Sequence, residues 1–215
     1  MRDRLKTSRT TLRRKPERGT HDFETIAAIL DEGLFCHAGF VVDGQPFVVP
    51  TAFGRRERTL YIHGSAASRM LRSLARELPV CVTVTLFDGL VFALSAFHHS
   101  VNYRSVMVLG TAREALGDEK LAGLEAITEH MARGRWDDAR KPTPQEMKAT
   151  SVLMLPIDEA SAKVREGPPL DDDEDLTLPV WAGVLPFSIA PGNPVPADGL
   201  ASGVALPAYV RRYRR

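Results

Sequence analysis

Residues 34–54 read LFCHAGFVVDGQPFVVPTAFG, two apolar runs that flank Asp43-Gly44. Asp-Gly between two runs rich in Val and Phe is the strongest short-range signal of a tight β-hairpin. Pro46 and Pro50 lack a backbone N–H group, so we expect an exposed edge or a bulge where they lie in the second strand. This stretch predicts antiparallel strand pairing early in the chain.

Further strands and helices follow in an order that does not alternate regularly. Apolar runs on either side of Asp88-Gly89 predict a second hairpin of the same kind. The predicted strands after the first hairpin are residues 59–64, 80–87, 90–97, 103–116 and 151–157. The predicted helices are residues 23–32, 68–78, 119–134 and 143–150, with Asp22 and Thr143 as caps. A doubly wound parallel sheet needs regular strand–helix alternation, so this order favours an antiparallel β-barrel with a few flanking helices.

The composition is that of an ordinary soluble protein. The chain has 215 residues, of which 44% are hydrophobic and 26% charged, and its net charge is +1. That balance creates no strong field toward nucleic acid or anionic lipid, so neither is an expected partner. No apolar run approaches the length of about 18 residues that a membrane span needs.

The cysteine content points to a compartment. Cys36 and Cys81 are the only two cysteines, and neither belongs to a CxxC pair. One disulfide between two thiols would not be enough to stabilise a domain of this size, and so low a cysteine content fits a reducing cytoplasm. The N-terminal residues also lack the apolar core of a signal peptide. We therefore expect a cytoplasmic protein.

Composition divides the chain into three parts. Residues 1–19 are basic and poor in large apolar groups, and we expect them to form a flexible tail. Residues 20–167 carry the predicted strands and helices and form the expected domain. Residues 168–215 are rich in proline and show little periodicity, so we expect an extension that packs on the barrel or on a partner subunit.

The familiar catalytic and metal-binding motifs are missing. The sequence has no GxGxxG after a strand, no Walker loop and no GxSxG. His98 and His99 are adjacent, and neighbours on a strand point to opposite faces, so we expect no metal site from this pair. A haem ligand needs only one histidine, and that option remains open. We assign no catalytic side chain and expect any reactive group to come from a cofactor.

Residues 60–71, LYIHGSAASRML, pass from strand to helix through a bend of small side chains. One interpretation is a tight connection and nothing more. The other is an anion site, because Ser65 and Ser68 supply hydroxyl groups and a helix start offers unpaired N–H groups. Arg69 can hold two oxygens at once. A phosphate is the natural occupant of such a site.

A second Arg/Ser pair, Arg104 and Ser105, begins a strand within residues 98–110, HHSVNYRSVMVLG. A single arginine at a strand edge is usually just solvated. Two such clusters among half-apolar strands suggest a phosphorylated, mostly flat ligand that lies on the barrel wall.

A set of short stretches, in their order and spacing, points to a family. They are ILDEG, DGQPFVVPTAFG, LYIHGSAASRML, VTVTLFDGLVFALSAFHHSVNYRSVMVLG, GRW, KATSVLMLPIDEASAKVREGPP and WAGVLP. Through them the chain resembles the FMN-binding split-barrel proteins related to pyridoxamine 5′-phosphate oxidase, in the branch that includes 5-nitroimidazole-resistance reductases. The resemblance runs from about Arg14 to about Pro186.

The resemblance implies a fold, an assembly and a site. The fold would be mainly β with flanking helices, an antiparallel FMN-binding split β-barrel, and two subunits would form a homodimer with flavin sites at their interface. The residues that would bind the cofactor are Val49, Pro50, Thr51 and Ala52 beside the ring, His63, Gly64, Ser65, Ala66, Ser68 and Arg69 around the phosphate and ribityl chain, Arg104 and Ser105 from the partner subunit, and Trp181, which would cover the ring or lie buried in the core.

The resemblance also implies redox chemistry. An FMN-dependent oxidoreductase would pass electrons from a nicotinamide donor to a small organic acceptor, as a nitroreductase or a pyridoxamine-phosphate oxidase does. The alternative is a flavin- or haem-binding carrier or sensor without turnover, since the family includes members that bind haem or a deazaflavin. A structural protein with an empty groove fits poorly with two Arg/Ser clusters.

Overall fold

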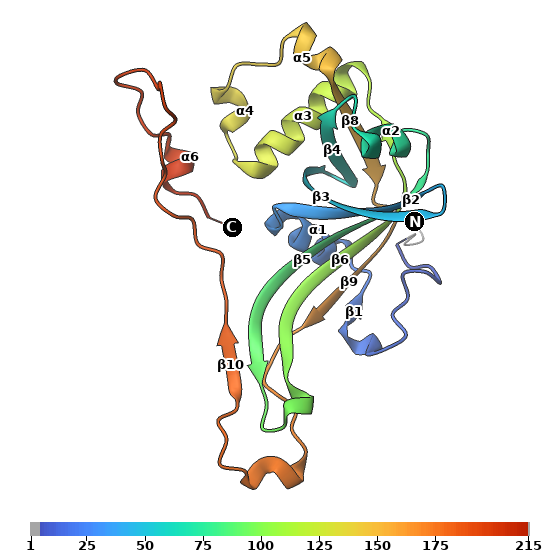
Figure 1. Ribbon diagram of the computed structural model, residues 1–215, viewed down its shortest axis with the longest axis vertical. Helices are drawn as coiled ribbons and strands as arrows, with labels where there is room; N and C mark the ends of the chain where they lie inside the picture. The colour runs from blue at the N-terminus through green and yellow to red at the C-terminus, as the bar shows by residue number, and fades with distance from the viewer. Residues whose placement is uncertain (1–4, 215) are drawn as a thin grey trace.

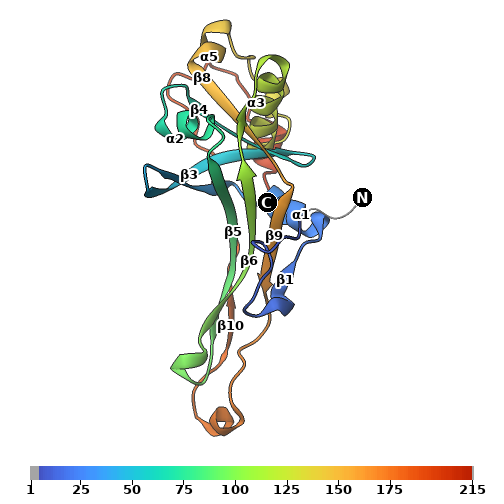
Figure 2. The same ribbon diagram turned by 90° about the vertical axis from the view of Figure 1, so that its right-hand side faces the viewer.

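The computed structural model describes residues 5–214, which form one antiparallel sheet that does not close into a ring (Figure 1, Figure 2). The strands follow the order β1-β9-β6-β5-β2-β3-β4-β8-β7, and β10 joins the edge of β5. Their bounds are β1 Gly19–Thr20, β2 Phe35–Val42, β3 Gln45–Arg56, β4 Thr59–Ser65, β5 Pro79–Phe92, β6 Ser100–Thr111, β7 Arg113–Glu114, β8 Thr150–Pro156, β9 Glu159–Arg165 and β10 Gly183–Pro186.

Helices flank this sheet. The α-helices are α1 Phe23–Glu32, α2 Arg69–Leu74, α3 Gly117–Met131, α4 Arg135–Asp138, α5 Pro144–Ala149 and α6 Ala208–Arg211, and the 3-10 helices are η1 Pro16–Arg18, η2 Ala96–His98 and η3 Asp173–Thr177. Asp22 caps α1 by accepting a hydrogen bond from Thr25 N at 2.8 Å, and Thr143 with Glu146 forms a capping box on α5. Both predicted caps are confirmed. Across residues 5–214, no helix has both the length and the apolar composition needed to cross a membrane.

The first Asp-Gly pair forms the predicted turn. Val42 pairs with Gln45, and the two residues between them have φ angles of 50° at Asp43 and 77° at Gly44. Positive φ at both central residues is what a type I′ hairpin turn requires. The β2–β3 hairpin therefore confirms the prediction from residues 34–54.

The second Asp-Gly pair does not form a turn, and that prediction is wrong. β5 runs without a break from Pro79 to Phe92, with a bulge in its pairing to β6 between Phe87 and Gly89. Neither Asp88 nor Gly89 has a positive φ. Glycine is needed here for a different reason, because a Cβ on Gly89 would lie 2.8 Å from the Leu185 carbonyl oxygen of β10.

The core is divided by β3, β4 and β8 into two clusters. In the larger cluster, apolar side chains of α1 and α2 meet the inner face of the sheet around Phe53. The smaller cluster joins α3 to β4 and β8 through Tyr61, Ile127 and Val152. A Cβ on Gly54 would lie 2.6 Å from the Ala126 carbonyl oxygen, so only glycine lets the α3 backbone approach β3 this closely. These clusters fix β3 and β4, which carry most of the predicted site.

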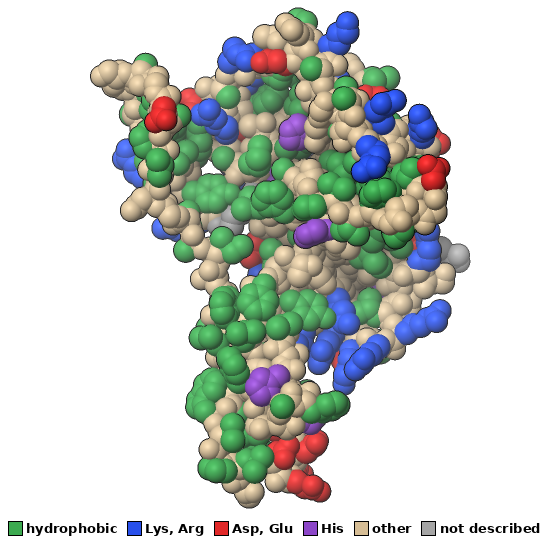
Figure 3. Space-filling view, in the orientation of Figure 1, with side chains coloured by type: hydrophobic (Ala, Val, Ile, Leu, Met, Phe, Trp, Pro, Cys, Tyr) green, Lys and Arg blue, Asp and Glu red, His purple; other side chains and the backbone are tan. Residues whose placement is uncertain are grey.

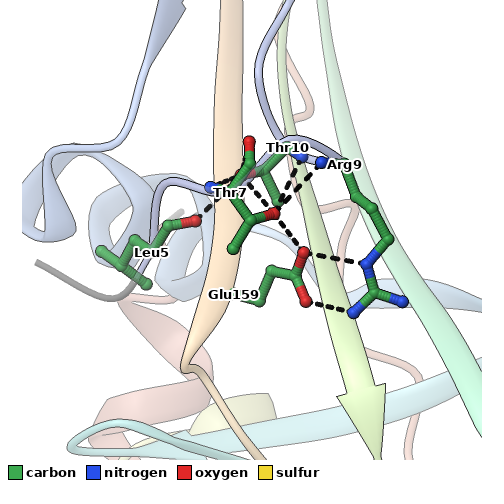
Figure 4. Close-up of polar contacts among 5 residues, drawn as sticks. All are labelled: Leu5, Thr7, Arg9, Thr10 and Glu159. Carbon is green, nitrogen blue, oxygen red and sulfur yellow. Dashed lines mark hydrogen bonds and ion pairs between the residues drawn. The ribbon is translucent and has the colours of Figure 1, made fainter.

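The described part of the predicted basic tail lies against β9 (Figure 4). Leu5 is fully buried in the larger cluster, and its carbonyl oxygen accepts from Ala160 N at 3.2 Å. Arg9 forms an ion pair with Glu159, and the Thr7 hydroxyl donates to the same carboxylate. The Thr10 hydroxyl donates to the Leu5 carbonyl oxygen at 2.9 Å. Apolar and polar contacts together anchor this segment.

The C-terminal extension forms a long arm on one side of the molecule, drawn in orange and red in Figure 1. β10 pairs with the far half of β5, with Val184 opposite Val91. Further on, Tyr209 donates to Asp138 at 2.6 Å. The arm therefore reaches from the far end of the β5–β6 ribbon to α4 of the same chain.

Candidate functional site

The bend between β4 and α2 is held by its own backbone and by one neighbour. Ser65 ends β4 opposite Thr150, and Ala66 N donates to the Ala149 carbonyl oxygen at 2.9 Å. Ser68 N donates to the Ser65 carbonyl oxygen at 2.8 Å. The position of Gly64 has little room for a side chain, because an added Cβ would lie 3.1 Å from Leu71 Cδ1. The bend is thus a fixed, narrow connection.

This bend leaves several donors without an acceptor. Among residues 5–214, the N–H groups of Arg69, Met70 and Leu71 and the Ser68 hydroxyl form no hydrogen bond. Arg69 forms no ion pair with a described carboxylate, and its guanidinium lies 4.7 Å above the Phe47 ring of β3. Because α2 has only six residues, its dipole contributes little. Arg69 and Ser68 are the groups best placed to hold an anion.

His63 adds an unpaired nitrogen beside this bend. Its Nδ1 atom is buried and has no hydrogen-bond partner among the described residues. Burial also lowers the pKa of the imidazole, so the ring is neutral at pH 7. A neutral imidazole with a buried orphan nitrogen can complete its hydrogen bonding with a ligand, or coordinate a metal.

β3 offers an unpaired backbone edge next to His63. One edge of β3 pairs with β2 from Gln45 to Ala52, but its pairing to β4 begins only at Phe53, opposite Ile62. No described strand covers the β4-side edge before Phe53. Val49 packs against the core, Pro50 is exposed, and Thr51 and Ala52 are half-buried. The free N–H and C=O groups of this stretch can bind a polar ring edge without any particular side chain.

Arg104 and Ser105 point to opposite faces of β6. Arg104 Nη2 lies 2.8 Å from Glu32 Oε1 of α1 and 2.8 Å from Asp88 Oδ1 of β5. Hydrogen bonds that the guanidinium donates to these two carboxylates, the one to Glu32 first, raise the pKa of Arg104. Ser105 Oγ donates to the Lys163 carbonyl oxygen at 3.3 Å. Sequence reasoning missed both carboxylates, since nothing in the local pattern links them to Arg104.

Trp181 lies on the arm, far from the bend. Its side chain is 69% exposed, so it is not a core tryptophan. Its ring centroid is 5.9 Å from that of Phe92, at the end of β5. Figure 1 shows this end of the sheet and α2 at opposite ends of the molecule. Within one chain the structure brings together His63, Arg69 and the β3 edge, and it leaves Trp181 and Ser105 elsewhere.

The outer face of the sheet carries exposed apolar side chains. Phe35 on β2 is 62% exposed and Val48 on β3 is 68% exposed, and they stand with Val41 and Phe87. Figure 3 shows green side chains over this part of the sheet and down the arm. Contiguous apolar surface of this kind is common at interaction sites.

Comparison with known proteins finds similar sequences and structures. The family model described as pyridoxamine 5′-phosphate oxidase matches residues 22–164. The structure of the flavocytochrome Anf3 from Azotobacter vinelandii is similar, with 39% identity, 97% of each chain covered and a TM-score of 0.90. An FAD- and haem-binding protein from Mycobacterium smegmatis shares 39% identity over 90% of this chain and 96% of its own, with a TM-score of 0.87.

A more distant likeness falls in the branch that the sequence suggested. A candidate 5-nitroimidazole antibiotic resistance protein from Bacteroides thetaiotaomicron is 26% identical over 68% of this chain and 86% of its own, with a TM-score of 0.59. A comparison with curated proteins gave no match. The similar structures and the open antiparallel sheet confirm the predicted split barrel. The chain belongs to the pyridoxamine 5′-phosphate oxidase family.

Proposed function

We propose that this protein binds a flavin and acts as an oxidoreductase that passes electrons from a nicotinamide donor to a small organic acceptor. This proposal depends on one observation. Ser68 and Arg69 have hydrogen-bond donors without a described acceptor, and they occur together with the free backbone edge of β3. Membership in a family with flavin-binding relatives supports it. Both cysteines are free thiols, which agrees with action in the cytoplasm.

Different residues would bind the phosphate, the ribityl chain and the ring of the flavin. Arg69 and Ser68 would hold the phosphate of FMN, and the small residues from Gly64 to Ala66 leave space for the ribityl chain above the backbone. The backbone of Val49–Ala52 would bind the polar edge of the ring. The bound flavin would supply the redox chemistry, and the protein would orient it and limit its contact with water.

A homodimer would complete the site. One chain leaves Ser105 and Trp181 away from the bend, so neither can touch a flavin held there by the same chain. The exposed apolar face of β2, β3 and β5 suits a second copy, because a surface with this many large apolar side chains is seldom left in water. We propose that this face meets its equivalent and that each flavin lies at the interface.

The test is to load the purified protein with FMN, remove free ligand and record its absorption. We expect about one flavin per chain, and anaerobic addition of NADH or NADPH should bleach it. Failure to retain flavin would reject the proposal. Retention with no bleaching by either donor would reject the electron-transfer step and leave a flavin-binding carrier.

Haem binding without turnover is the second candidate. One relative is described as a flavocytochrome and another as binding both FAD and haem. In this chain, His63 is a neutral histidine with a buried, unpartnered Nδ1. Titration with haemin should produce a Soret band that His63→Ala abolishes, while His37→Ala, at an exposed histidine on β2, keeps it. A Soret band unaffected by His63→Ala would exclude this ligand.

A further inference from the structure

The end of β9 carries a buried arginine with no acidic partner. Arg165 is 6% exposed. Its guanidinium donates to the Asn102 side-chain oxygen, to the Gly167 carbonyl oxygen at 3.3 Å and to the Pro168 carbonyl oxygen at 3.4 Å, all of them neutral acceptors. Among residues 5–214 no carboxylate pairs with it, and its Nε–H group donates to no acceptor. A full positive charge is therefore buried among dipoles alone.

Two more cations adjoin it. Burial is the main cause that lowers the pKa of Arg165, and the nearby charge of Arg18, at the end of η1, lowers it further. Lys163 precedes Arg165 by two residues on β9, so strand alternation places the two on the same face. Neither Arg18 nor Lys163 has a side-chain partner among the described residues. Figure 3 shows Lys and Arg side chains gathered over this region of β1, β9 and η1.

A cavity of about 350 Å³ opens beside Arg18 and Arg165, while Lys163 lies outside its lining. Arg18 and Arg165 both line it, as does Thr20 of β1. Glu17 and Glu166 also reach its wall, but both are exposed and neither forms an ion pair with the arginines. The cavity thus has two guanidinium groups on its wall and no counter-ion bound to them.

Charge and space together favour an anionic occupant. A buried charge without an opposite partner is unfavourable, and a second cation beside it adds repulsion. An anion in the cavity would relieve both. Arg18 and Arg165 both line the cavity, and Lys163 lies just outside it on the same face of β9 as Arg165. Two guanidinium groups match a phosphate group better than a single carboxylate, because a phosphate offers more oxygens and more negative charge to share between them.

We propose that Arg18, Lys163 and Arg165 form a binding site for a phosphate group of a nucleotide. Lys163 stands opposite Ser105 in the β6–β9 pairing. This step rests on the proposed function, in which Ser105 of one subunit reaches the flavin bound by the other. A ligand longer than FMN would then extend past Ser105 to Lys163. The second phosphate of FAD is the occupant that this path favours, and a free phosphate compound is the other source of the same chemistry.

The test removes two charges that hold no described contact. The Arg18→Gln/Lys163→Gln variant keeps Arg165, which supports the loop at Gly167. Arg13→Gln/Arg14→Gln is the matched control, because both side chains are exposed, belong to the same basic segment and do not line the cavity. Calorimetric titrations of flavin-free protein with FAD, FMN and inorganic pyrophosphate should show FAD and pyrophosphate weakened by at least about tenfold in the first variant. FMN should be unaffected, and the control should change none of the three.

Each other outcome has a definite meaning. Loss of pyrophosphate binding with equal affinities for FAD and FMN would keep the phosphate site and assign it to a free phosphate compound. If the protein binds pyrophosphate through these residues but binds neither flavin, the proposed function is wrong and the phosphate site remains. If the affinities for FAD and pyrophosphate are the same in the wild type and in the double variant, the proposed phosphate site is wrong.

Discussion

Arg69 carries most of the proposed phosphate contact, since its guanidinium lies over the Phe47 ring and forms no hydrogen bond or ion pair with a described residue. In Arg69→Ala the loss of a charge-assisted contact of about 1.5–3 kcal/mol should weaken FMN binding by about 10- to 150-fold. Riboflavin lacks the phosphate, so its affinity should not change. Fluorescence titrations of both ligands measure this, with Arg72→Ala, at the next arginine on α2, as the control. Equal losses for FMN and riboflavin would mean that Arg69 only shapes the helix.

Cys36 should react far more slowly than an exposed thiol. Burial raises the pKa of the Cys36 thiol to about 12, and it also raises that of Cys81, which is only partly buried. The thiolate is the reactive form, so a disulfide reagent at pH 8 should modify native Cys36 extremely slowly. Native Cys81→Ser should therefore show almost no thiol reaction, and the denatured variant should show one thiol per chain. Rapid modification of this native variant would contradict the buried position of Cys36.

At the scale of elements, Arg104 joins the end of α1 to the bulge of β5. Each of the three side chains is about one-third exposed, so solvent weakens the ion pairs, and we expect Arg104→Met to cost about 1 kcal/mol. That corresponds to a decrease in Tm of about 2–4 °C for a chain of this size. Arg113→Met, which breaks an exposed pair with Glu119, should change Tm less. If Arg104→Met weakens FMN binding and leaves Tm unchanged, Arg104 is instead the cofactor contact that the family resemblance implies.

The N-terminal segment should separate from β9 in acid. Hydrogen bonding from Arg9 is the largest cause that lowers the pKa of Glu159. A carboxyl group with a lowered pKa in the folded state stabilises the fold above its unfolded pKa of about 4.3, and this contribution disappears as the pH falls through the folded value. The protection factors of the amide hydrogens in residues 5–14, measured against the unprotected rate at each pH, should therefore fall below about pH 4. Glu159→Gln should show low protection factors at pH 7 as well; high protection there would mean that Leu5 alone holds the segment.

The two Asp-Gly pairs show what local sequence can and cannot predict. Asp43-Gly44 and the caps at Asp22 and Thr143 are set by neighbouring residues, and the sequence predicts all three. The sequence also predicts the bend before α2, although Ala149 from a distant part of the chain helps to hold it. Gly89 is set by β10, which is distant in the chain, so the same dipeptide was misread as a turn. The carboxylates around Arg104 were missed for the same reason, since Glu32 lies on α1 and meets β6 only in the folded sheet.

At the scale of the whole molecule, flavin binding and dimerisation should be lost together. Val48 is exposed on the apolar outer face, so Val48→Asp should leave the subunit folded while placing a charge in the proposed interface. Sedimentation velocity should show a dimer for the wild type and a monomer for the variant, with reduced FMN occupancy. A stable wild-type monomer with full flavin occupancy would contradict an interface site.

The arm also has a consequence for synthesis on the ribosome. β2 covers only the first part of one β5 edge, from Val80 to Thr83, and β10 covers Gly89–Phe92 near the far end. At a synthesis rate of about 5–20 residues per second, several seconds pass between translation of β5 and translation of β10. Throughout that interval the far half of β5 has a bare edge, which is the kind of surface that neighbouring nascent chains pair with. A premature stop before Gly183 would make that interval permanent, and we expect such shortened chains to aggregate.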